Sequence, residues 1–392
     1  MTTTTPVITD HDAVTALLRP ASSSRPKSSG DFEYVFPAIR GVQAGREYYV
    51  TMCPLRLIPR LFVFDEEELR PELRAQRNLN KGRVPEIARY ILNNPSSYVF
   101  SALTASVDAE VRFEPYGDSG TGTRVGALTI PMSARFVIND GQHRRAGIQR
   151  ALAENPGLGD ESIAIVLFLD VGLERCQQMF ADLNRYAIRP ARSISVLYDH
   201  RDEISGITRL AMFRLPLFRD LTETEGSSLS GRSRKLFTLS GFYTANRALL
   251  DGIDQPSLER RVDLTAAYWE VVAGQFPEWR QVYDRMLTAG EIRRDFIHSH
   301  GIVLHALGKI GNSLIGASHA QARWDSKLRG LADLDWRRDN AACWEGRAIL
   351  GGRVCKSSAA VLLTAAAIRT ALGLPLSAAE QRAEDAFRRG DT

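Results

Sequence analysis

ARFVINDGQHRRAGIQRA, residues 134–151, joins an apolar strand pattern directly to an arginine-rich helix pattern. Phe136 and Ile138 are spaced as on one face of a strand, and the apolar run stops at Asp140. Gly141 then supplies a backbone bend that a β-carbon would hinder. The stretch therefore predicts a strand that turns at once into a helix, and we expect the N-terminal half of the chain to be organised around this junction.

The helix after the bend has apolar positions at Ala146, Ile148 and Ala151. Its first turn combines unpaired amide N–H groups, the positive end of the helix dipole and two guanidinium groups, which suits a phosphate. We expect the Asp140 side chain to cap these amides or to hold a metal or water near the phosphate. A capped surface helix with solvated arginines is the alternative interpretation. The predicted phosphate- or nucleotide-binding residues here are Gly141, Gln142, His143, Arg144 and Arg145.

The string DGQHRRA, residues 140–146, resembles the DGQHR signature of a bacterial family related to ParB and sulfiredoxin-like domains. Within that family the chain is most similar to the DndB proteins, which are associated with DNA phosphorothioate (sulfur) modification. The resemblance spans most of residues 32–375. It implies an α+β fold, in which a ParB/sulfiredoxin-like mixed α/β N-terminal domain precedes a mainly helical C-terminal domain. Residues 140–145 are called the signature turn below.

Composition shifts along the chain predict three parts. A Ser- and Pro-rich beginning predicts a flexible arm, a β-rich stretch with the signature turn predicts the DGQHR domain, and helical patterns with basic loops follow. The predicted limits are 1–30 for the arm, 31–205 for the DGQHR domain and 206–392 for the helical domain.

The bulk composition restricts the function classes. A net charge of +4 over 392 residues excludes a polycation, so any nucleic-acid surface must be a local patch. The four cysteines have no CxxC spacing and no paired histidines nearby, so we expect reduced thiols and no metal site. The N-terminal residues lack a signal-peptide pattern and no apolar run reaches membrane-spanning length, so a cytoplasmic protein without membrane contact is expected.

Short apolar or alternating runs predict strands, and apolar residues three and four apart predict helices. The run 161–170 is continuously apolar, as expected for a strand buried on both faces. The other predicted strands are 32–41, 46–55, 55–64, 99–107, 111–115, 125–131 and 135–139. The predicted C-terminal helices are within 209–220, 240–250, 264–276, 296–315 and 358–373.

Two further groups resemble blocks of the same family. Asn184 and Arg189 are implied to close over the phosphate site from the other side, although a simple helix cap explains Asn184 equally well. Arg77 and Arg83 are DNA-contact candidates that, with Asn80, resemble positions recurring before the signature. Nearby acidic residues offer salt bridges that would absorb such arginines instead.

Basic residues recur in two C-terminal loops. The stretch 223–240 brings Ser and Gly together with cations, which suits phosphate contacts, whereas a mobile inter-helix loop is the alternative. In 322–361, arginines interleave with Trp324, Trp336 and Trp344, a combination used on nucleic-acid surfaces, although we expect two of the three tryptophans to be core anchors. The DNA-binding candidates are Arg232, Arg234, Lys235, Arg337, Arg338, Arg347, Arg353 and Lys356.

These features support two function classes. The resemblance implies a protein that binds double-stranded DNA and regulates transcription of the modification genes, with other sulfur-modification proteins as partners and a homo-oligomer if operator selectivity is strong. The alternative is a ParB-like hydrolase of ATP or CTP with Mg²⁺, or a DNA nickase, with Asp140 and His143 as catalytic residues. No Walker A string is present, and the sulfiredoxin cysteine is replaced at the signature by Gln142 and His143. A scaffold for the sulfur-transfer machinery is a third possibility.

Overall fold

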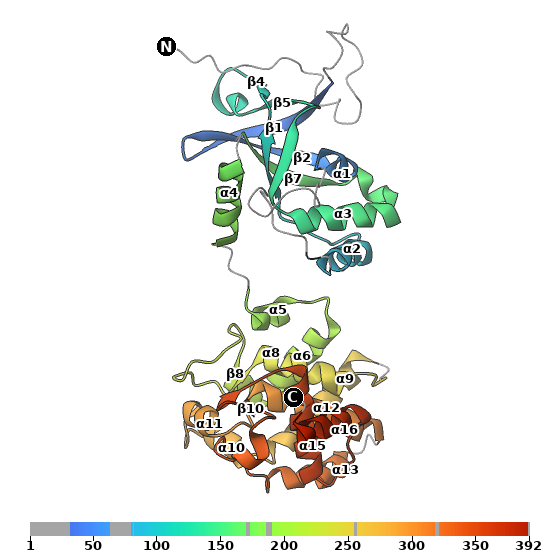
Figure 1. The fold of residues 1–392 in the computed structure, drawn as a ribbon, viewed down its shortest axis with the longest axis vertical. Coiled ribbons are helices and arrows are strands. Elements are labelled where there is room, and N and C mark those ends of the chain that lie inside the picture. Colours follow the sequence, from blue (N-terminus) through green and yellow to red (C-terminus); the bar gives the residue numbers. More distant parts are fainter. Residues whose placement is uncertain are drawn as a thin grey trace. The chain divides into compact units, whose positions relative to one another are not determined.

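The computed structural model describes residues 32–62, 80, 82–169, 173–185, 190–254, 257–317 and 321–390. By its internal contacts the chain divides into two compact units, Met1–Ile188 and Arg189–Thr392, both drawn in Figure 1. The expected arm and the candidates Arg77 and Arg189 lie outside the described residues. A domain limit at residue 205 stays a prediction, and the contacts assign helix α5 (Arg192–Tyr198) to the second unit.

Among the described residues of the first unit, seven strands form one sheet in the order β4-β5-β1-β2-β7-β3-β6. All neighbours pair antiparallel except β3 and β7, which run parallel. β7, the last of these strands in the sequence, therefore joins a four-stranded group to the β3–β6 pair. The strands are β1 (Glu33–Gln43), β2 (Arg46–Pro54), β3 (Leu103–Asp108), β4 (Arg112–Pro115), β5 (Val125–Pro131), β6 (Arg135–Asp140) and β7 (Ser162–Phe168).

The helices of the first unit cover both faces of this sheet (Figure 1). On one face Ile138 of β6 and Ile148 of α3 share a buried core. On the other face Asn139, the next residue of β6, contacts Met179 of α4, because neighbouring strand residues point to opposite sides. The helical elements are the 3₁₀ turn Leu55–Leu57, α1 (Ile58–Leu61), α2 (Arg83–Asn93), the 3₁₀ turn Gly120–Thr123, α3 (Gln142–Glu154), the 3₁₀ turn Pro156–Asp160 and α4 (Leu173–Arg185).

The expected strand–bend–helix junction is confirmed. β6 ends at Asp140, Gly141 has a φ of +106° and α3 begins at Gln142. Only glycine adopts this positive φ without strain, so the bend follows directly from the sequence. Gly147 of α3 lies against α2, where a β-carbon would collide with Ile87, so the two helices cross closely at this point.

Two strand expectations were wrong in part. Of the expected strand 55–64, residues 63–64 lie outside the described part, and residues 55–62 do not extend the sheet. A 3₁₀ turn and α1 occupy residues 55–61, because Pro59 cannot donate to a ladder but fits the first turn of a helix. β7 is a strand, but it is fully buried on one face only. Ile163, Ile165 and Leu167 are buried, whereas the alternate residues are half-buried.

The second unit is mainly helical, as expected, so the whole chain is a mixed α/β protein. None of the helices in the described ranges has the length and apolar character needed to cross a bilayer. Its elements after α5 are α6 (Glu203–Arg214), α7 (Pro216–Leu221), β8 (Thr222–Glu223), β9 (Phe237–Thr238), α8 (Leu239–Leu249), α9 (Leu258–Ala273), α10 (Pro277–Tyr283), α11 (Ala289–Asp295), α12 (Gly301–Ala317), α13 (Gln321–Leu328), the 3₁₀ turn Arg329–Leu331, α14 (Ala341–Trp344), β10 (Ile349–Leu350), β11 (Arg353–Val354), α15 (Ser358–Ala371) and α16 (Ala378–Arg389).

Helices α8 and α12 pack at the centre of the second unit. Gly308 of α12 lies against the backbone of α8, where a β-carbon would collide with the Ala245 carbonyl oxygen. Gly311 lies one turn further on, against the ring of Tyr268. This glycine-mediated approach brings the two helices close enough to begin side by side: a β-carbon on Gly241 would lie 4.0 Å from the Cα of Gly301.

A buried histidine makes the stability of the second unit depend on pH. His298 is fully buried, accepts a hydrogen bond at Nδ1 from the Trp279 indole over 2.9 Å, and lies 3.8 Å from the Glu278 carboxylate. Burial nevertheless lowers the pKa of His298 to about 3. Between this value and its ordinary pKa the unfolded chain binds a proton that the folded chain does not, so stability is lost as the pH falls below about 6.5.

Lowering the pH from 7 to 5 should therefore cost the second unit about 2 kcal/mol through His298. We expect this loss in urea unfolding followed by tryptophan fluorescence, because all five tryptophans lie within residues 269–344. The variant His298→Asn keeps an acceptor near Nδ1 but cannot titrate, so its stability should fall by about 2 kcal/mol less over the same interval. An equal pH response of the two proteins would contradict the prediction.

Candidate functional site

The signature turn is closed by Arg144. This side chain is 15% exposed, forms an ion pair with Asp140 and donates to the Ser101 hydroxyl and the Ala102 carbonyl oxygen, each over 2.7 Å. It therefore ties the start of α3 to the segment that precedes β3. The Arg144 guanidinium is hydrogen-bonded to acceptors within the protein, so a contact with a phosphate would require these hydrogen bonds to break.

The bend itself is buried. A β-carbon on Gly141 would collide with the Leu103 side chain and lie 3.3 Å from the Arg144 guanidinium carbon. Asp140 does not cap α3, which has no side-chain cap at its N-terminus. That expectation was wrong because the Asp140 carboxylate pairs with Arg144, one turn further along.

The other signature residues have separate surroundings. The half-buried His143 accepts a hydrogen bond at Nε2 from the backbone N–H of Asn80 over 3.0 Å, so a segment preceding α2 does meet the signature. Gln142 and Arg145 are buried, at 5% and 8% exposed. The exposed Arg83 begins α2, and the side chain of Asn184 lies outside the described residues. The phosphate-binding role of these residues stays a prediction.

Sequence reasoning missed Asn139. Its side chain is fully buried, and its amide donates to the Ser106 hydroxyl over 2.7 Å. Its carbonyl oxygen has no hydrogen-bond partner within the described ranges. The available signal was a polar residue inside the apolar strand of the signature.

In the second unit, several of the candidate DNA-binding cations form hydrogen bonds or ion pairs within the protein. Lys235 donates to the Asp220 carbonyl oxygen over 2.8 Å, and Arg337 forms a two-pronged pair with Asp335 over 3.0 Å. Arg347 is 14% exposed, pairs with Glu384 over 2.6 Å and lies over the ring of Phe387. The expectation that Arg347 contacts DNA is therefore not supported by its position.

The tryptophans of 322–361 do not form a stacking surface. Trp324, Trp336 and Trp344 are 2%, 5% and 0% exposed. Trp336 and Trp344 stack on one another with ring centroids 5.2 Å apart. All three are core residues rather than the two expected. Arg329 and Arg337, which lie between them in the sequence, pair with the carboxylates of Asp325 and Asp335, while the rings pack inward.

Other arginines remain available. Arg232, Arg234 and Arg353 are exposed, and within the described ranges their side chains have no hydrogen-bond or ion-pair partner. Arg232 and Arg234 belong to residues 227–236, here called the anchored loop. They line a hollow of about 890 Å³ together with Arg285, an exposed arginine that sequence reasoning missed.

Arg293 of α11 fixes the anchored loop. Its guanidinium donates to the backbone carbonyl oxygens of Ser230, Ser233 and Lys235. A glycine allows this close approach, since a β-carbon on Gly290 would collide with a carbonyl oxygen of the loop. The backbone of the loop that carries Arg232 and Arg234 is therefore fixed to α11 by these hydrogen bonds.

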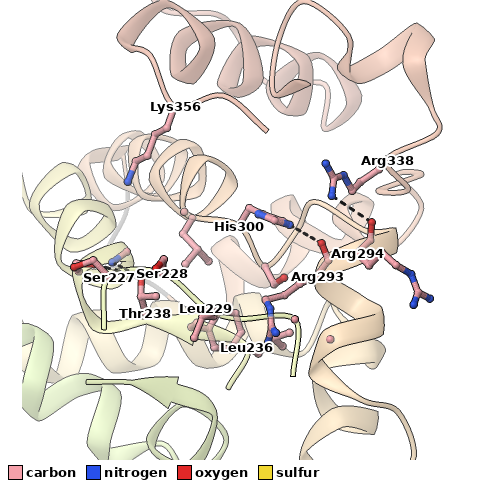
Figure 2. Close-up of a pocket in the computed structure, with 18 residues that line it drawn as sticks. Ser227, Ser228, Leu229, Leu236, Thr238, Arg293, Arg294, His300, Arg338 and Lys356 are labelled. Carbon is pink, nitrogen blue, oxygen red and sulfur yellow. Dashed lines mark hydrogen bonds between the residues drawn. The ribbon is translucent and has the colours of Figure 1, made fainter. Parts of the chain in front are cut away.

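Beside the anchored loop lies a second hollow of about 520 Å³, called the cationic pocket below (Figure 2). Its cations are Arg293, Arg294, Arg338 and Lys356, and no Asp or Glu is among the described residues that line it. Arg338 donates to the Arg294 and Gly352 carbonyl oxygens over 3.4 and 3.1 Å. Hydroxyl groups line it as well, from Ser227, Ser228, Thr238, Ser240 and Ser299.

Desolvation shifts the pKa of three lining groups. It lowers the pKa of Arg293, which stays charged because an arginine pKa starts above 12. It lowers the pKa of Lys356, with a further contribution from the charge of Arg192. Desolvation also lowers the pKa of His300, which is therefore neutral at pH 7, and its Nε2 lies 2.9 Å from the Arg293 carbonyl oxygen.

No metal site of three or more His, Cys, Asp or Glu side chains occurs within the part of the chain that the structure describes.

A comparison with known families finds the profile described as DndB, DNA-sulfur modification-associated, over residues 36–375. The chain belongs to the DndB family. No curated protein and no solved structure was found to match it. DndB membership implies a role in a DNA sulfur-modification system and association with DNA. The ParB-like character of the first unit stays a prediction.

Proposed function

We propose that this DndB-family protein binds duplex DNA through the exposed arginines of its second unit and thereby regulates the genes of its modification system. The observation that carries the proposal is the pair Arg232 and Arg234, exposed on a loop that Arg293 holds in place. Arginines that no carboxylate neutralises can each replace a counterion at a backbone phosphate. Arg285 and Arg353 supply further charge of the same kind.

The exposed arginines of the anchored loop are better suited to contacts with DNA phosphates than to hydrogen bonds with base edges. Phosphate contacts position a protein on the duplex without reading its sequence. A regulator of its own operon therefore needs either a second copy, whose spacing would select an operator, or a base-reading element. The family model supports only an association with DNA sulfur modification. Regulation and partner proteins of the modification system are therefore parts of the proposal that rest on the resemblance to DndB proteins and not on the geometry.

Replacing Arg232 and Arg234 together by alanine should weaken duplex binding by at least about tenfold near 0.1 M salt. The slope of log affinity against log salt should become less steep by about two, one for each phosphate that the variant no longer neutralises. The measurement is a mobility-shift titration of the full chain across a salt series, with the promoter of the modification genes and a random duplex of equal length.

Arg337→Ala is the matched control, because Arg337 is also exposed but already paired with Asp335. It should leave both affinity and salt slope close to those of the parent protein. Equal losses in the control and the double variant, or no loss in either, would refute the proposed interface. Equal affinity for promoter and random duplex would refute the regulatory role while leaving DNA binding intact.

The hydrolase and nickase hypotheses for Asp140 and His143 stay predictions. Both side chains have intramolecular partners in the structure, Arg144 and the Asn80 backbone, so no observation favours these activities over DNA binding.

A further inference from the structure

The cationic pocket has the electrostatics of an anion site. Four cationic side chains line it and no Asp or Glu is among its described lining residues, although one of the four, Arg294, is paired over 2.7 Å with Asp295, which does not line the pocket. One of the four, Lys356, lies at the start of α12: a β-carbon on Gly301 would be 3.4 Å from its ammonium nitrogen. Arg293, Arg338 and Lys356 form no ion pair among the described residues, so their charges repel each other, and an anionic ligand would relieve that repulsion.

Two helices direct their N-termini to the same place. α8 has 11 residues and α12 has 17, and their first residues meet where Gly241 approaches Gly301. Residues at both N-termini line the pocket: Thr238, Ser240 and Gly241 for α8, and Ser299, His300 and Gly301 for α12. The positive ends of two helix dipoles therefore add to the side-chain charge.

A buried hydroxyl without a partner gives independent evidence for a ligand. Ser299 is 4% exposed and lines the pocket, yet its Oγ has no hydrogen-bond partner among the described residues. Leaving a buried hydroxyl unpaired costs about 1 to 3 kcal/mol. The neighbouring Thr238 hydroxyl, in contrast, has a partner: it caps α8 by accepting a hydrogen bond from the Gly241 N–H over 3.1 Å.

The size and the apolar wall narrow the ligand class. A cavity of about 520 Å³ exceeds what an inorganic anion needs and falls in the range of small-molecule sites. Leu229, Leu236, Phe237 and Leu304 also line the pocket. Leu229 and Leu236 are labelled near Arg293 in Figure 2. Such a wall suits the flat, weakly polar base of a nucleotide, while the helix N-termini suit its phosphate.

We propose that the cationic pocket binds a nucleoside phosphate, with its phosphate at the N-termini of α8 and α12 and its base against the apolar wall. The ligand is either a free nucleotide or the 5′-phosphorylated nucleotide at a DNA strand end. This site goes beyond duplex binding, since the exposed arginines of the anchored loop need no pocket. It also differs from the signature turn, which lies in the other unit.

The test is calorimetric titration of the full chain with AMP, ATP, adenosine, inorganic phosphate and a short single strand with or without a 5′-phosphate. AMP or ATP should bind, inorganic phosphate more weakly, and adenosine not detectably. A preference for the 5′-phosphorylated over the unphosphorylated strand identifies a strand end as the ligand, and binding of nucleotides alone identifies the free form. Failure of all phosphorylated probes to bind at millimolar concentration overturns the proposal.

Two variants assign the binding to the pocket. Ser299→Ala removes only the unpaired hydroxyl and should weaken nucleotide binding by about fivefold without loss of stability. Lys356→Met should weaken it by about tenfold. Lys327→Met, an exposed lysine of α13 that does not line the pocket, is the matched control and should have no effect.

Hydrogen exchange locates the ligand independently of affinity. Amides of residues 238–242 and 299–304 should be protected by bound AMP. Protection confined to residues 140–145, with unchanged affinity in Ser299→Ala and Lys356→Met, would overturn the proposal in favour of the signature turn. Duplex binding is measured in the parent protein as well. If the parent protein binds duplex but no nucleotide, only the pocket proposal fails, and if it binds nucleotide but no duplex, only the DNA interface is refuted.

Discussion

Gly141→Ala should lower the free energy of unfolding of the first unit by about 3 kcal/mol. A β-carbon at a φ of +106° costs about 1 to 2 kcal/mol in backbone strain. The collision with Leu103 adds about 1 to 3 kcal/mol of overpacking. Because the change lies at the junction of β6 and α3, faster amide exchange should appear in β3, β6 and α3, measured by mass spectrometry.

Gly45→Ala separates the two causes. Gly45 has a φ of +75° in the turn between β1 and β2, and a β-carbon there would meet nothing within 4 Å. Its cost should be the strain alone, about 1 kcal/mol. Equal costs at the two glycines would show that the signature bend is not packed as the structure has it.

Arg369→Met should destabilise the second unit by about 4 kcal/mol. Arg369 is 6% exposed and holds three elements together: it pairs with Glu380 of α16 over 3.1 Å and donates to Ser313 of α12 over 2.8 Å from its place on α15. Removing one partner of a buried pair leaves the other charge without compensation, at about 3 to 5 kcal/mol. Urea unfolding followed by tryptophan fluorescence measures this loss directly.

Arg388→Met is the control for charge removal at the same helix. Arg388 also pairs with a carboxylate of α16, Glu384, over 3.2 Å, but its side chain is 70% exposed. Solvent screens such a pair, so the change should cost less than about 1 kcal/mol. A similar cost for the two arginines would mean that the α12–α15–α16 contacts do not depend on the buried ion pair.

Local patterns predicted much of the fold. The β1–β2 hairpin, the strand and helix around Gly141 and the main C-terminal helices were expected from spacing alone, because these elements depend on neighbouring residues. Residues 55–61 were mistaken for a strand because a short apolar run does not distinguish strand from helix. A strand was correctly expected within 161–170, where β7 spans Ser162–Phe168, but its half-buried face depends on what covers the sheet.

The site was harder to predict, because partners distant in sequence decide what a charged residue does. Arg144 looked available from its spacing, yet its acceptors in residues 101–102 precede it by about 40 positions. Arg347 and Arg353 have similar neighbours in the sequence. The Arg347 side chain is paired with Glu384, whereas the Arg353 side chain has no partner among the described residues.

The cationic pocket was largely missed for the same reason. Arg338 and Lys356 were expected to contact DNA, but nothing in the sequence indicated that they meet Ser299 and the starts of two helices. The available signal was the Ser299–Gly301 run at the beginning of an apolar helix, which resembles an ordinary cap. Only the packing of α8 against α12 distinguishes a ligand pocket from an ordinary helix cap at this position.

The position of β7 has a consequence for synthesis on the ribosome. Until residues 162–168 have emerged, β2 and β3 each present an unpaired edge, and the two halves of the sheet have no strand to connect them. Open edges of this kind are templates for pairing with other chains, so we expect the nascent protein to be most prone to aggregation during this period. A translational pause before this point would prolong that exposure, whereas one after residue 168 would not.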